Sequence, residues 1–253
     1  MMRRPTVATV SLPALAANVR AVRAMLERDN ARGQPAPGLI AVVKANAYGH
    51  GATTVGLALE SAGASMLACA DIEEGVALRE AGVTIPILVF GALSVRHLGG
   101  VFTHRLTPTV STPGAARALE AAAAARGVRL ACHLKIDTGM NRLGFRYDNL
   151  RRTLPPVLQS PHLSFDAVYT HFATADLPES PFMEEQRSRF EIATAALGAL
   201  GLRGLRRHAA NSAALLRDTR TWYDWVRPGL LLYGVVPPPL AAADLGLCPA
   251  LSL

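Results

Sequence analysis

Residues 39–51 read LIAVVKANAYGHG, and they contain the unit from which we expect the fold to be built. A short run rich in β-branched residues ends at Lys44 and passes directly into a loop with two glycines. An alanine-rich helical pattern follows at 54–62. Short apolar runs indicate buried strands, and longer periodic patterns indicate helices. The stretch therefore predicts a strand, a loop and a helix in succession.

The same order recurs along the chain. Eight candidate strands alternate with helical segments in most of the gaps, at 39–44, 65–70, 86–90, 106–110, 128–136, 163–170, 205–209 and 225–227. Ser11 and Thr112 are cap residues followed closely by a proline, which is typical of helix starts. Eight such units predict an α/β fold of the (β/α)8 type, a TIM-type barrel. An open doubly wound sheet is the alternative, but it would need a GxGxxG turn after its first strand, and this sequence has none there.

The barrel is expected to span 11–243, which leaves two short segments at the ends. Residues 1–10 and 244–253 do not fit the eight units, and each contains an apolar stretch that looks like a strand piece with nothing to pair against. We expect both segments to belong with a C-terminal β domain that is not present in this chain.

Composition excludes several classes of protein. Half of the 253 residues are hydrophobic and 18% are charged, as in globular proteins. The net charge of +7 comes from scattered arginines, so we expect no nucleic-acid partner. The three cysteines are far apart, the N-terminus lacks the apolar core of a signal peptide, and no apolar stretch is long enough to cross a membrane. We expect a cytoplasmic protein without a membrane partner.

Lysine is rare in this chain. Of the 26 lysine and arginine residues only two are lysines, Lys44 and Lys135. Arginine stays protonated, whereas a desolvated lysine can lose its proton and attack a carbonyl. The two positions are therefore candidates for amine chemistry. The alternative is that each is a chance survivor of codon drift, and that Lys44 simply extends off a strand end.

Further polar clusters follow the later strands. Residues 135–144 bring Lys135, Asp137 and Arg142 to one rim, either as a stabilising ion-pair network or with Arg142 as a clamp for a carboxylate. His171 has no second histidine at a metal-ligand spacing, so we expect no metal site. A lone histidine of this kind is more often structural than catalytic.

Asn211 to Ala214 and residues 226–234 follow the last two strands, where barrels frequently bind phosphate. We expect Ser212 to cap the following helix and direct its amides at an anion, and Gly229 to leave its backbone N–H unobstructed. A cap plus a turn is the alternative interpretation. A phosphate cradle opposite a rare lysine indicates a phosphorylated aldehyde cofactor and a small-molecule substrate.

Five segments, in this order, resemble the alanine racemase family: AVVKANAYGHG (41–51), KIDTGMNRLG (135–144), THFATAD (170–176), NSAA (211–214) and VRPGLLLYG (226–234). The resemblance runs from Thr6 to Leu253. It implies a barrel that binds pyridoxal 5′-phosphate, a β-rich C-terminal domain, a head-to-tail homodimer, and the supply of D-alanine for peptidoglycan.

The resemblance also implies roles for individual residues. Lys44 would hold the cofactor through its amine and remove the α-proton of the D-enantiomer. The phosphate would be held by Tyr48, Ser212, Gly229 and Leu230, with Asn211 near it.

At the other end of the cofactor, His171 would stack against the pyridine ring and Arg227 would donate to its nitrogen. Because arginine only donates, that nitrogen must stay an unprotonated acceptor, which weakens the electron sink and favours racemisation over transamination. Arg142 would face the substrate carboxylate. Lys135 matches a lysine that is often carbamylated in the family, and the carbamate would orient Arg142.

Racemisation needs a proton donor on each face of the planar intermediate. In the family the second donor is a tyrosine of the C-terminal domain, contributed by the partner subunit, and neither Tyr223 nor Tyr233 matches it. An alanine racemase whose chain here is impaired by this absence is the first hypothesis. A racemase for another amino acid such as serine is the second, and a non-catalytic barrel that binds the cofactor is the third.

Overall fold

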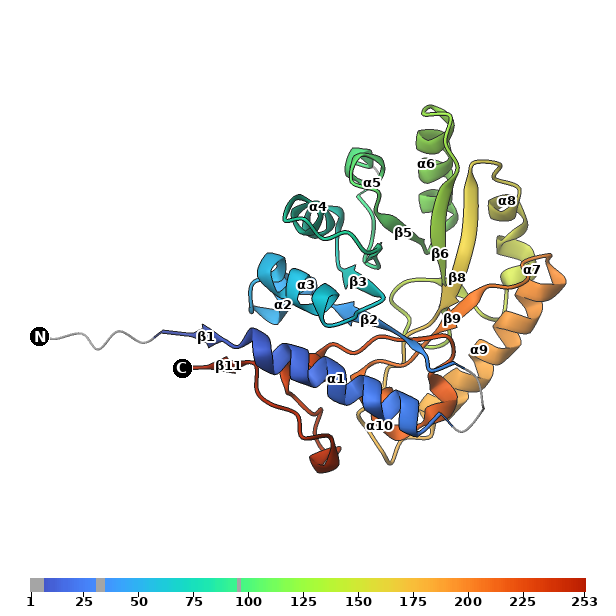
Figure 1. The fold of residues 1–253 in the computed structure, drawn as a ribbon. Coiled ribbons are helices and arrows are strands. Elements are labelled where there is room, and N and C mark those ends of the chain that lie inside the picture. Colours follow the sequence, from blue (N-terminus) through green and yellow to red (C-terminus); the bar gives the residue numbers. More distant parts are fainter. Residues whose placement is uncertain (1–6, 31–34, 95–96) are drawn as a thin grey trace, which may run out of the picture.

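Eight parallel strands close on themselves at the centre of the molecule (Figure 1). The structure is a computed structural model and describes residues 7–30, 35–94 and 97–253. The strands, in barrel order, are β2 (Gly38–Val42), β3 (Met66–Cys69), β4 (Ile87–Val89), β5 (Thr107–Val110), β6 (Leu130–Asp137), β8 (Leu163–Tyr169), β9 (Arg206–His208) and β10 (Trp225–Val226). The barrel closes where Trp225 and Val226 pair with Gly38 and Leu39. The predicted (β/α)8 barrel is confirmed.

Helices surround the strands (Figure 1). They are α1 (Leu12–Arg28), α3 (Ala52–Ser61), α4 (Ile72–Glu80), α5 (Gly99–Thr103), α6 (Pro113–Ala124), α7 (Leu150–Thr153), α8 (Pro155–Leu158), α9 (Phe182–Ala199) and α10 (Ser212–Arg217). Both predicted helix starts are confirmed, because Ser11 accepts the N–H of Ala14 and Thr112 accepts that of Ala115. Shorter elements are α2 (Lys44–Tyr48), β7 (Phe145–Arg146), and the 3-10 turns η1 (Thr219–Thr221), η2 (Leu230–Tyr233) and η3 (Ala243–Leu245).

The core has two layers because the strands are buried on both faces. Alternate residues of β2 divide between them: Ile40 and Val42 join the cluster inside the barrel, whereas Leu39 and Ala41 join the cluster that includes the helices. This explains why the strands are almost continuously hydrophobic instead of alternating. The interior cluster reaches Tyr48 and Phe90, which places the site directly above a packed core.

The ends of the chain differ from the expectation that they lack partners. Thr9–Val10 (β1) and Leu251–Ser252 (β11) pair with each other in an antiparallel ribbon at the side of the barrel (Figure 1). Buried Asn18 of α1 holds the returning segment, since it donates to Cys248 O at 2.8 Å and accepts the Cys248 N–H at 2.8 Å. A strand needs a neighbour with unpaired backbone N–H and C=O groups, and the two end segments of the chain provide these for each other. Residues 1–6 lie outside the described part.

Within the described ranges no helix combines the length and the apolar character needed to cross a membrane.

Candidate active site

A cavity of about 380 Å³ opens at the carboxyl ends of the barrel strands. Every site residue predicted from the sequence lines it: Lys44, Tyr48, Lys135, Arg142, His171, Asn211, Ser212, Arg227, Gly229 and Leu230. Parallel strands place their carboxyl ends on one side of the barrel, so residues nearly 190 positions apart in the sequence meet there.

Lys44 lies at the start of an unusual backbone turn. The sequence predicts that Lys44 ends the first strand, but β2 ends at Val42 and Lys44 begins α2. The four residues after it, Ala45 to Tyr48, all have φ between 51° and 55°, so α2 is a left-handed turn. Lys44 and Tyr48 stand one turn apart and face the same cavity, with Lys44 Nζ 5.8 Å from the centre of the Tyr48 ring.

Tyr48 packs against Gly229, and both residues line the cavity. A Cβ atom at position 229 would come within 2.4 Å of Tyr48 Oη, so only glycine fits there. The Tyr48 hydroxyl has no hydrogen-bond partner within the described part of the chain, and burial raises its pKa. It is therefore a protonated donor directed at the space beside Gly229.

Ser212 and Gly229 differ from their predicted roles. Asn211, not Ser212, caps α10, because its side chain accepts the Ala214 N–H at 2.9 Å. Ser212 Oγ instead accepts the N–H groups of Gly229 at 3.0 Å and Leu231 at 3.4 Å, so the Gly229 N–H is not free. Both hydroxyl lone pairs are then used, and what Ser212 retains is its own proton, which it can donate to an anion.

Arg227 is buried and held in place by three acceptors. Its Nη2 donates to the carbonyls of Thr170 at 2.8 Å and Ala209 at 2.9 Å, and Nη1 contacts His208 Nδ1 at 2.9 Å. Burial lowers its pKa to about 10, so it remains a cation at neutral pH. The Nε–H has no acceptor among the residues that the structure describes, which leaves it for a ligand.

A pair of buried histidines continues from Arg227 into the barrel. Since arginine only donates, His208 Nδ1 must accept, and the proton of His208 sits on Nε2. That proton is donated to His133 Nδ1 at 3.1 Å. Burial and the nearby Arg227 lower the pKa of both rings, so both stay neutral. The chain of contacts fixes the tautomer of each ring.

The remaining polar wall of the cavity is strongly cationic. Burial, Arg227 and Arg142 lower the pKa of Lys135 to about 8. Burial, Arg227 and Lys135 lower the pKa of His171 to about 3, so this ring is neutral. Lys135 is thus close to giving up its proton at physiological pH, and the site has an excess of positive charge suited to an anion.

Sequence reasoning missed two residues that shape the site. Tyr169 lines the cavity, stacks on His208 at 4.7 Å, and shares a hydrogen bond with Thr109 at 3.0 Å. Its place directly before the predicted THFATAD segment was the available signal. Buried Gln186 joins two loops, because it accepts the Ala173 N–H and donates to Thr138 Oγ1 and His171 O. It lies on α9, and no local pattern marks it.

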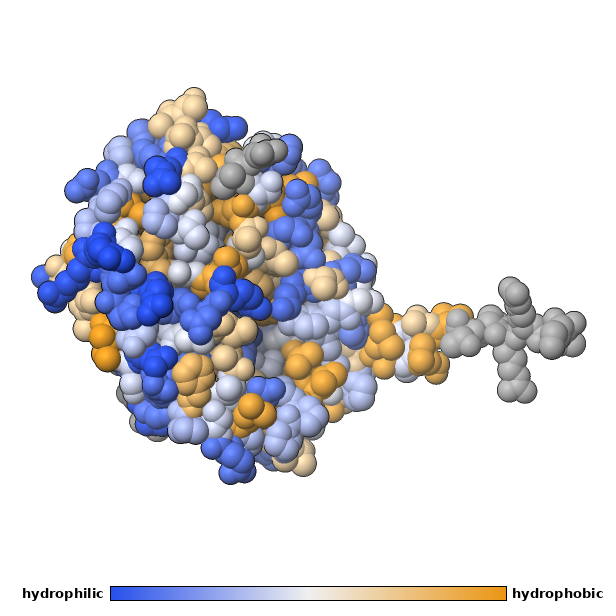
Figure 2. Space-filling view, turned by 180° about the vertical axis from the view of Figure 1, so that it is seen from behind, coloured by the Kyte–Doolittle hydropathy of each residue, from blue (hydrophilic) through white to orange (hydrophobic). Residues whose placement is uncertain are grey.

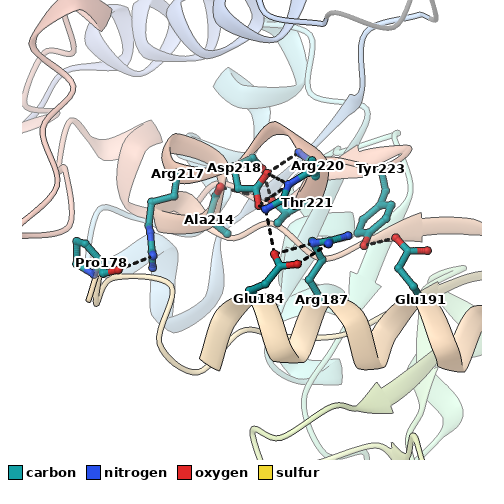
Figure 3. Close-up of polar contacts among 10 residues, drawn as sticks. All are labelled: Pro178, Glu184, Arg187, Glu191, Ala214, Arg217, Asp218, Arg220, Thr221 and Tyr223. Atoms are coloured by element: carbon teal, nitrogen blue, oxygen red, sulfur yellow. Dashed lines mark hydrogen bonds and ion pairs between the residues drawn. The ribbon is translucent and has the colours of Figure 1, made fainter. Parts of the chain in front are cut away.

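A polar network joins α9 to η1 and α10 (Figure 3). Glu184 on α9 pairs with Arg187 at 2.5 Å and with Arg220 at 3.0 Å, and Arg220 also pairs with Asp218. Arg217 at the end of α10 donates to four carbonyls of the loop after β8: Thr174, Ala175, Leu177 and Pro178. The loop that carries His171 is thereby fixed to α10, which begins at Ser212.

The same figure shows the Tyr223 hydroxyl donating to Glu191, at 2.8 Å. The Tyr233 hydroxyl donates to Val42 O at 3.0 Å. Both groups are engaged in structural bonds, and neither residue lines the cavity.

Comparison with known proteins agrees with this geometry. A sequence model described as "Alanine racemase, N-terminal domain" matches residues 10–237. The alanine racemase of Symbiobacterium thermophilum is 41% identical over 98% of this chain and 64% of its own length, and that of Nostoc sp. is 39% identical over 96% and 62%. The solved alanine racemase of Clostridium difficile 630 superposes with a TM-score of 0.89 at 29% identity, over 99% of this chain and 64% of its own.

The chain thus spans less than two thirds of the length of these relatives. The matched part contains every residue that lines the cavity. The chain belongs to the family of alanine racemase N-terminal domains.

Proposed function

We propose that the cavity binds pyridoxal 5′-phosphate and that the chain is the cofactor-bearing barrel of an alanine racemase. The observation that carries the proposal is one cavity that combines a lysine amine, an arginine that can only donate, and a set of donors for an anion. As in the family, the whole protein would be a cytoplasmic homodimer that supplies D-alanine for peptidoglycan.

The end of the cavity near Gly229 fits a phosphate group. Tyr48 and Ser212 each have a hydroxyl proton to donate there, and Leu230 is the first residue of a 3-10 turn, so its N–H has no partner within the turn. Asn211 supports this wall indirectly by capping α10. Donors without a compensating acceptor are the arrangement that an anion requires.

The part of the cavity beside Arg227 and His171 fits an aromatic ring with an unprotonated nitrogen. Arg227 offers N–H groups only, and the neutral His171 ring provides a flat surface beside it. Pyridoxal phosphate, when bound, supplies an electron sink for the negative charge left as the α-proton departs. Arg227, which only donates, would face the ring nitrogen and keep it from taking a proton, which would limit the strength of the sink.

The catalytic work of this chain falls to Lys44. Its Nζ would hold the cofactor covalently and then take the α-proton of D-alanine as a base. Arg142 would hold the substrate carboxylate through its planar guanidinium group. Lys135, with a pKa near 8, would supply the neutral amine that carbamylation needs, and the resulting anion would pair with Arg142.

A second proton donor for the other face is not among the tyrosines described here. Tyr48 is assigned to the phosphate, and the Tyr169 hydroxyl is hydrogen-bonded to Thr109, with a pKa raised to about 12 by burial. We expect that donor from a C-terminal domain of the partner subunit, as the family resemblance implies.

The test measures exchange of the α-proton for deuterium after the chain is supplied with pyridoxal phosphate. We expect faster exchange for D-alanine than for L-alanine, because Lys44 serves one face. Borohydride reduction followed by peptide mass mapping should place the cofactor on Lys44 and not on Lys135.

The Lys44→Arg variant should lose both the adduct and the exchange, since arginine keeps the positive charge but cannot attack the aldehyde. Equal exchange of the two enantiomers would mean that these residues hold a second base. Exchange of serine in preference to alanine would favour a racemase for another amino acid. An adduct without any exchange would favour a non-catalytic barrel, and no adduct at all would overturn the proposal.

A further inference from the structure

The left-handed turn after Lys44 is strained and needs stabilising contacts from the surrounding structure. Ala45, Asn46 and Ala47 have ψ values of 46° to 54° and Tyr48 has a φ of 53°, although none of them is glycine. The left-handed conformation costs roughly 1–2 kcal/mol for each residue with a Cβ atom. Such a backbone persists only where the surrounding structure stabilises it.

One carboxylate reaches the first residue of this turn. Glu74, in the first turn of α4, accepts the Ala45 N–H through Oε1 at 2.6 Å and the Ala70 N–H through Oε2 at 2.8 Å. The first N–H belongs to the residue directly after Lys44, and the second to the residue directly after β3. Hydrogen bonds to a charged acceptor are roughly twice as strong as neutral ones.

The geometry differs from that of an ordinary helix cap. Asp71 caps α4 by accepting the Glu74 N–H at 2.8 Å, so Glu74 occupies the position from which a glutamate usually reaches back to the N–H of the capping residue. Here the Glu74 carboxylate instead accepts the N–H groups of Ala70 and of Ala45, which is 29 residues away in the sequence. Stabilising α4 alone would not require the contact with Ala45.

We propose that Glu74 is a positioning residue for Lys44. By fixing the N–H of Ala45, it sets the direction in which the chain leaves Lys44 and keeps the lysine and Tyr48 on the same side of the turn, facing the cavity. Asn46 supports the far end of the turn, because its side chain accepts the Ala52 N–H at 2.8 Å. The inference rests on the proposed function, in which Lys44 holds the cofactor.

The chain offers a matched control. Glu73 is the neighbouring carboxylate in the same first turn of α4 and is exposed. Glu73→Gln removes the same charge from the same helix end without touching the bonds to Ala45 and Ala70. Glu74→Gln keeps one acceptor oxygen but turns an N–H group toward one of the two donors, and Glu74→Ala removes both acceptors.

The first measurement needs no cofactor. The 253-residue chain is treated briefly with acetic anhydride, and the acetylation rate of Lys44 is compared with that of Lys135 by peptide mass mapping. These are the only two lysines, so Lys135 is an internal reference. In Glu74→Ala we expect the ratio of Lys44 to Lys135 to rise at least threefold, because the released turn exposes Lys44 alone. Glu74→Gln should lie between Glu74→Ala and the unchanged chain.

The second measurement titrates pyridoxal phosphate and traps the adduct on Lys44 with borohydride. We expect the apparent affinity to fall about tenfold in Glu74→Ala, which corresponds to about 1.4 kcal/mol, and to stay unchanged in Glu73→Gln. Unchanged acetylation ratios and affinities in both Glu74 variants would overturn the inference. An equal rise in the acetylation rates of Lys44 and Lys135 would also overturn it. So would loss of the native circular dichroism spectrum, since either result would mean that Glu74 stabilises the whole fold and does not act on Lys44 in particular. If the unchanged chain forms no adduct, the proposed function fails, and the acetylation ratio still decides whether Glu74 positions Lys44.

Discussion

At the scale of single residues, Lys135 shows how the surroundings of a side chain change its pKa. It is 4% exposed and lies among Arg227, Arg142 and Lys44, which all oppose its charge, while only Asp137 favours it. Its pKa of about 8 follows from burial first and from these cations second. An arginine in this place could not shed its proton in the same way. Both lysines of this chain thus line the cavity, where an amine that can lose its proton has a chemical use.

Gly229 permits a test of the proposed phosphate end. Gly229→Ala would bring a methyl group within 2.4 Å of Tyr48 Oη and force the tyrosine away. We expect a loss of about 1–3 kcal/mol in the free energy of unfolding and weaker binding of pyridoxal phosphate. Urea denaturation and a cofactor titration measure the two effects.

Two variants control this test. Gly198→Ala, on α9 with no atom within 4 Å of the added carbon, should be neutral or slightly stabilising. Adding Tyr48→Phe to Gly229→Ala should restore part of the stability, because the closest clashing atom is the hydroxyl oxygen. If the single variant Gly229→Ala kept the stability and the cofactor affinity of the unchanged chain, the contact between Tyr48 and Gly229 would not be needed for either property.

At the scale of elements, α9 acts on the site through one side chain. Gln186 is completely buried and joins the loop after β6, at Thr138, to the loop after β8, at His171 and Ala173. It uses both of its functional groups, accepting through the oxygen and donating through the nitrogen. The helix thereby fixes the loop that carries His171 without lining the cavity itself.

Gln186→Glu keeps the shape of the side chain but removes its donors. Two acceptors, Thr138 Oγ1 and His171 O, would then face a carboxylate in a buried place. We expect the free energy of unfolding to fall by about 1–3 kcal/mol at neutral pH, measured by urea denaturation. The difference in stability from the unchanged chain should shrink in acid, where the new carboxyl group regains a proton.

The exposed neighbour provides the comparison. The Glu185 side chain pairs with Arg189, and Glu185→Gln should change stability by less than about 0.5 kcal/mol. If the two variants were equally stable, Gln186 would not be the link between the loops.

At the scale of the whole molecule, three histidines near the cavity are neutral: His133 and His208 are buried in the barrel, and His171 is half-buried at the cavity wall. Burial and neighbouring cations lower the pKa of His133 and His171 to about 3, and that of His208 well below its usual 6.5. In the unfolded chain the three rings take up protons near pH 6.5, whereas in the folded chain they do not. Their contribution to stability is therefore present above pH 6.5 and is lost as the pH falls from there toward 3.

This predicts an early loss of stability in acid. Three such groups give a slope of up to about 4 kcal/mol per pH unit once the unfolded rings are protonated. Urea denaturation between neutral pH and about pH 5 measures it. His97 is exposed, and His97→Gln should leave the slope unchanged. Constant stability over this range would contradict the assignment of neutral buried rings.

The ribbon of β1 and β11 is the other feature of the whole molecule. It projects from the barrel, and apolar surface gathers there (Figure 2). Val7 before β1, Leu251 in β11 and Leu253 after it are 64%, 37% and 88% exposed. The contacts of Asn18 with Cys248 and the bond from Ala250 N to Tyr233 O at 3.1 Å tie its C-terminal strand to the barrel, and Ser11 N donates to Ala250 O. The assignment of residues 1–10 and 244–253 to a separate β domain stays a prediction.

Much of the fold and of the site could be predicted from the sequence, for a definite reason. The period of the apolar residues marks strands and helices, and strict alternation of the two leaves few topologies. A parallel barrel then gathers all strand ends on one side, so Lys44, Lys135, His171, Ser212 and Arg227 had to meet. The chemical nature of each group, amine or guanidinium or hydroxyl, needs no structure at all.

Only the tertiary structure decided which atoms each group contacts. Ser212 was predicted to cap its helix, yet its hydroxyl accepts the N–H of Gly229, and Asn211 caps instead. The contacts of Glu74 with Ala45 and of Gln186 with Thr138 join segments far apart in the sequence. Hydrogen bonds depend on angles and distances of a few ångströms, which no pattern of residue types encodes. The sequence by itself determined which groups surround the cavity, and the packing of the barrel decided which of their protons and lone pairs remain for a ligand.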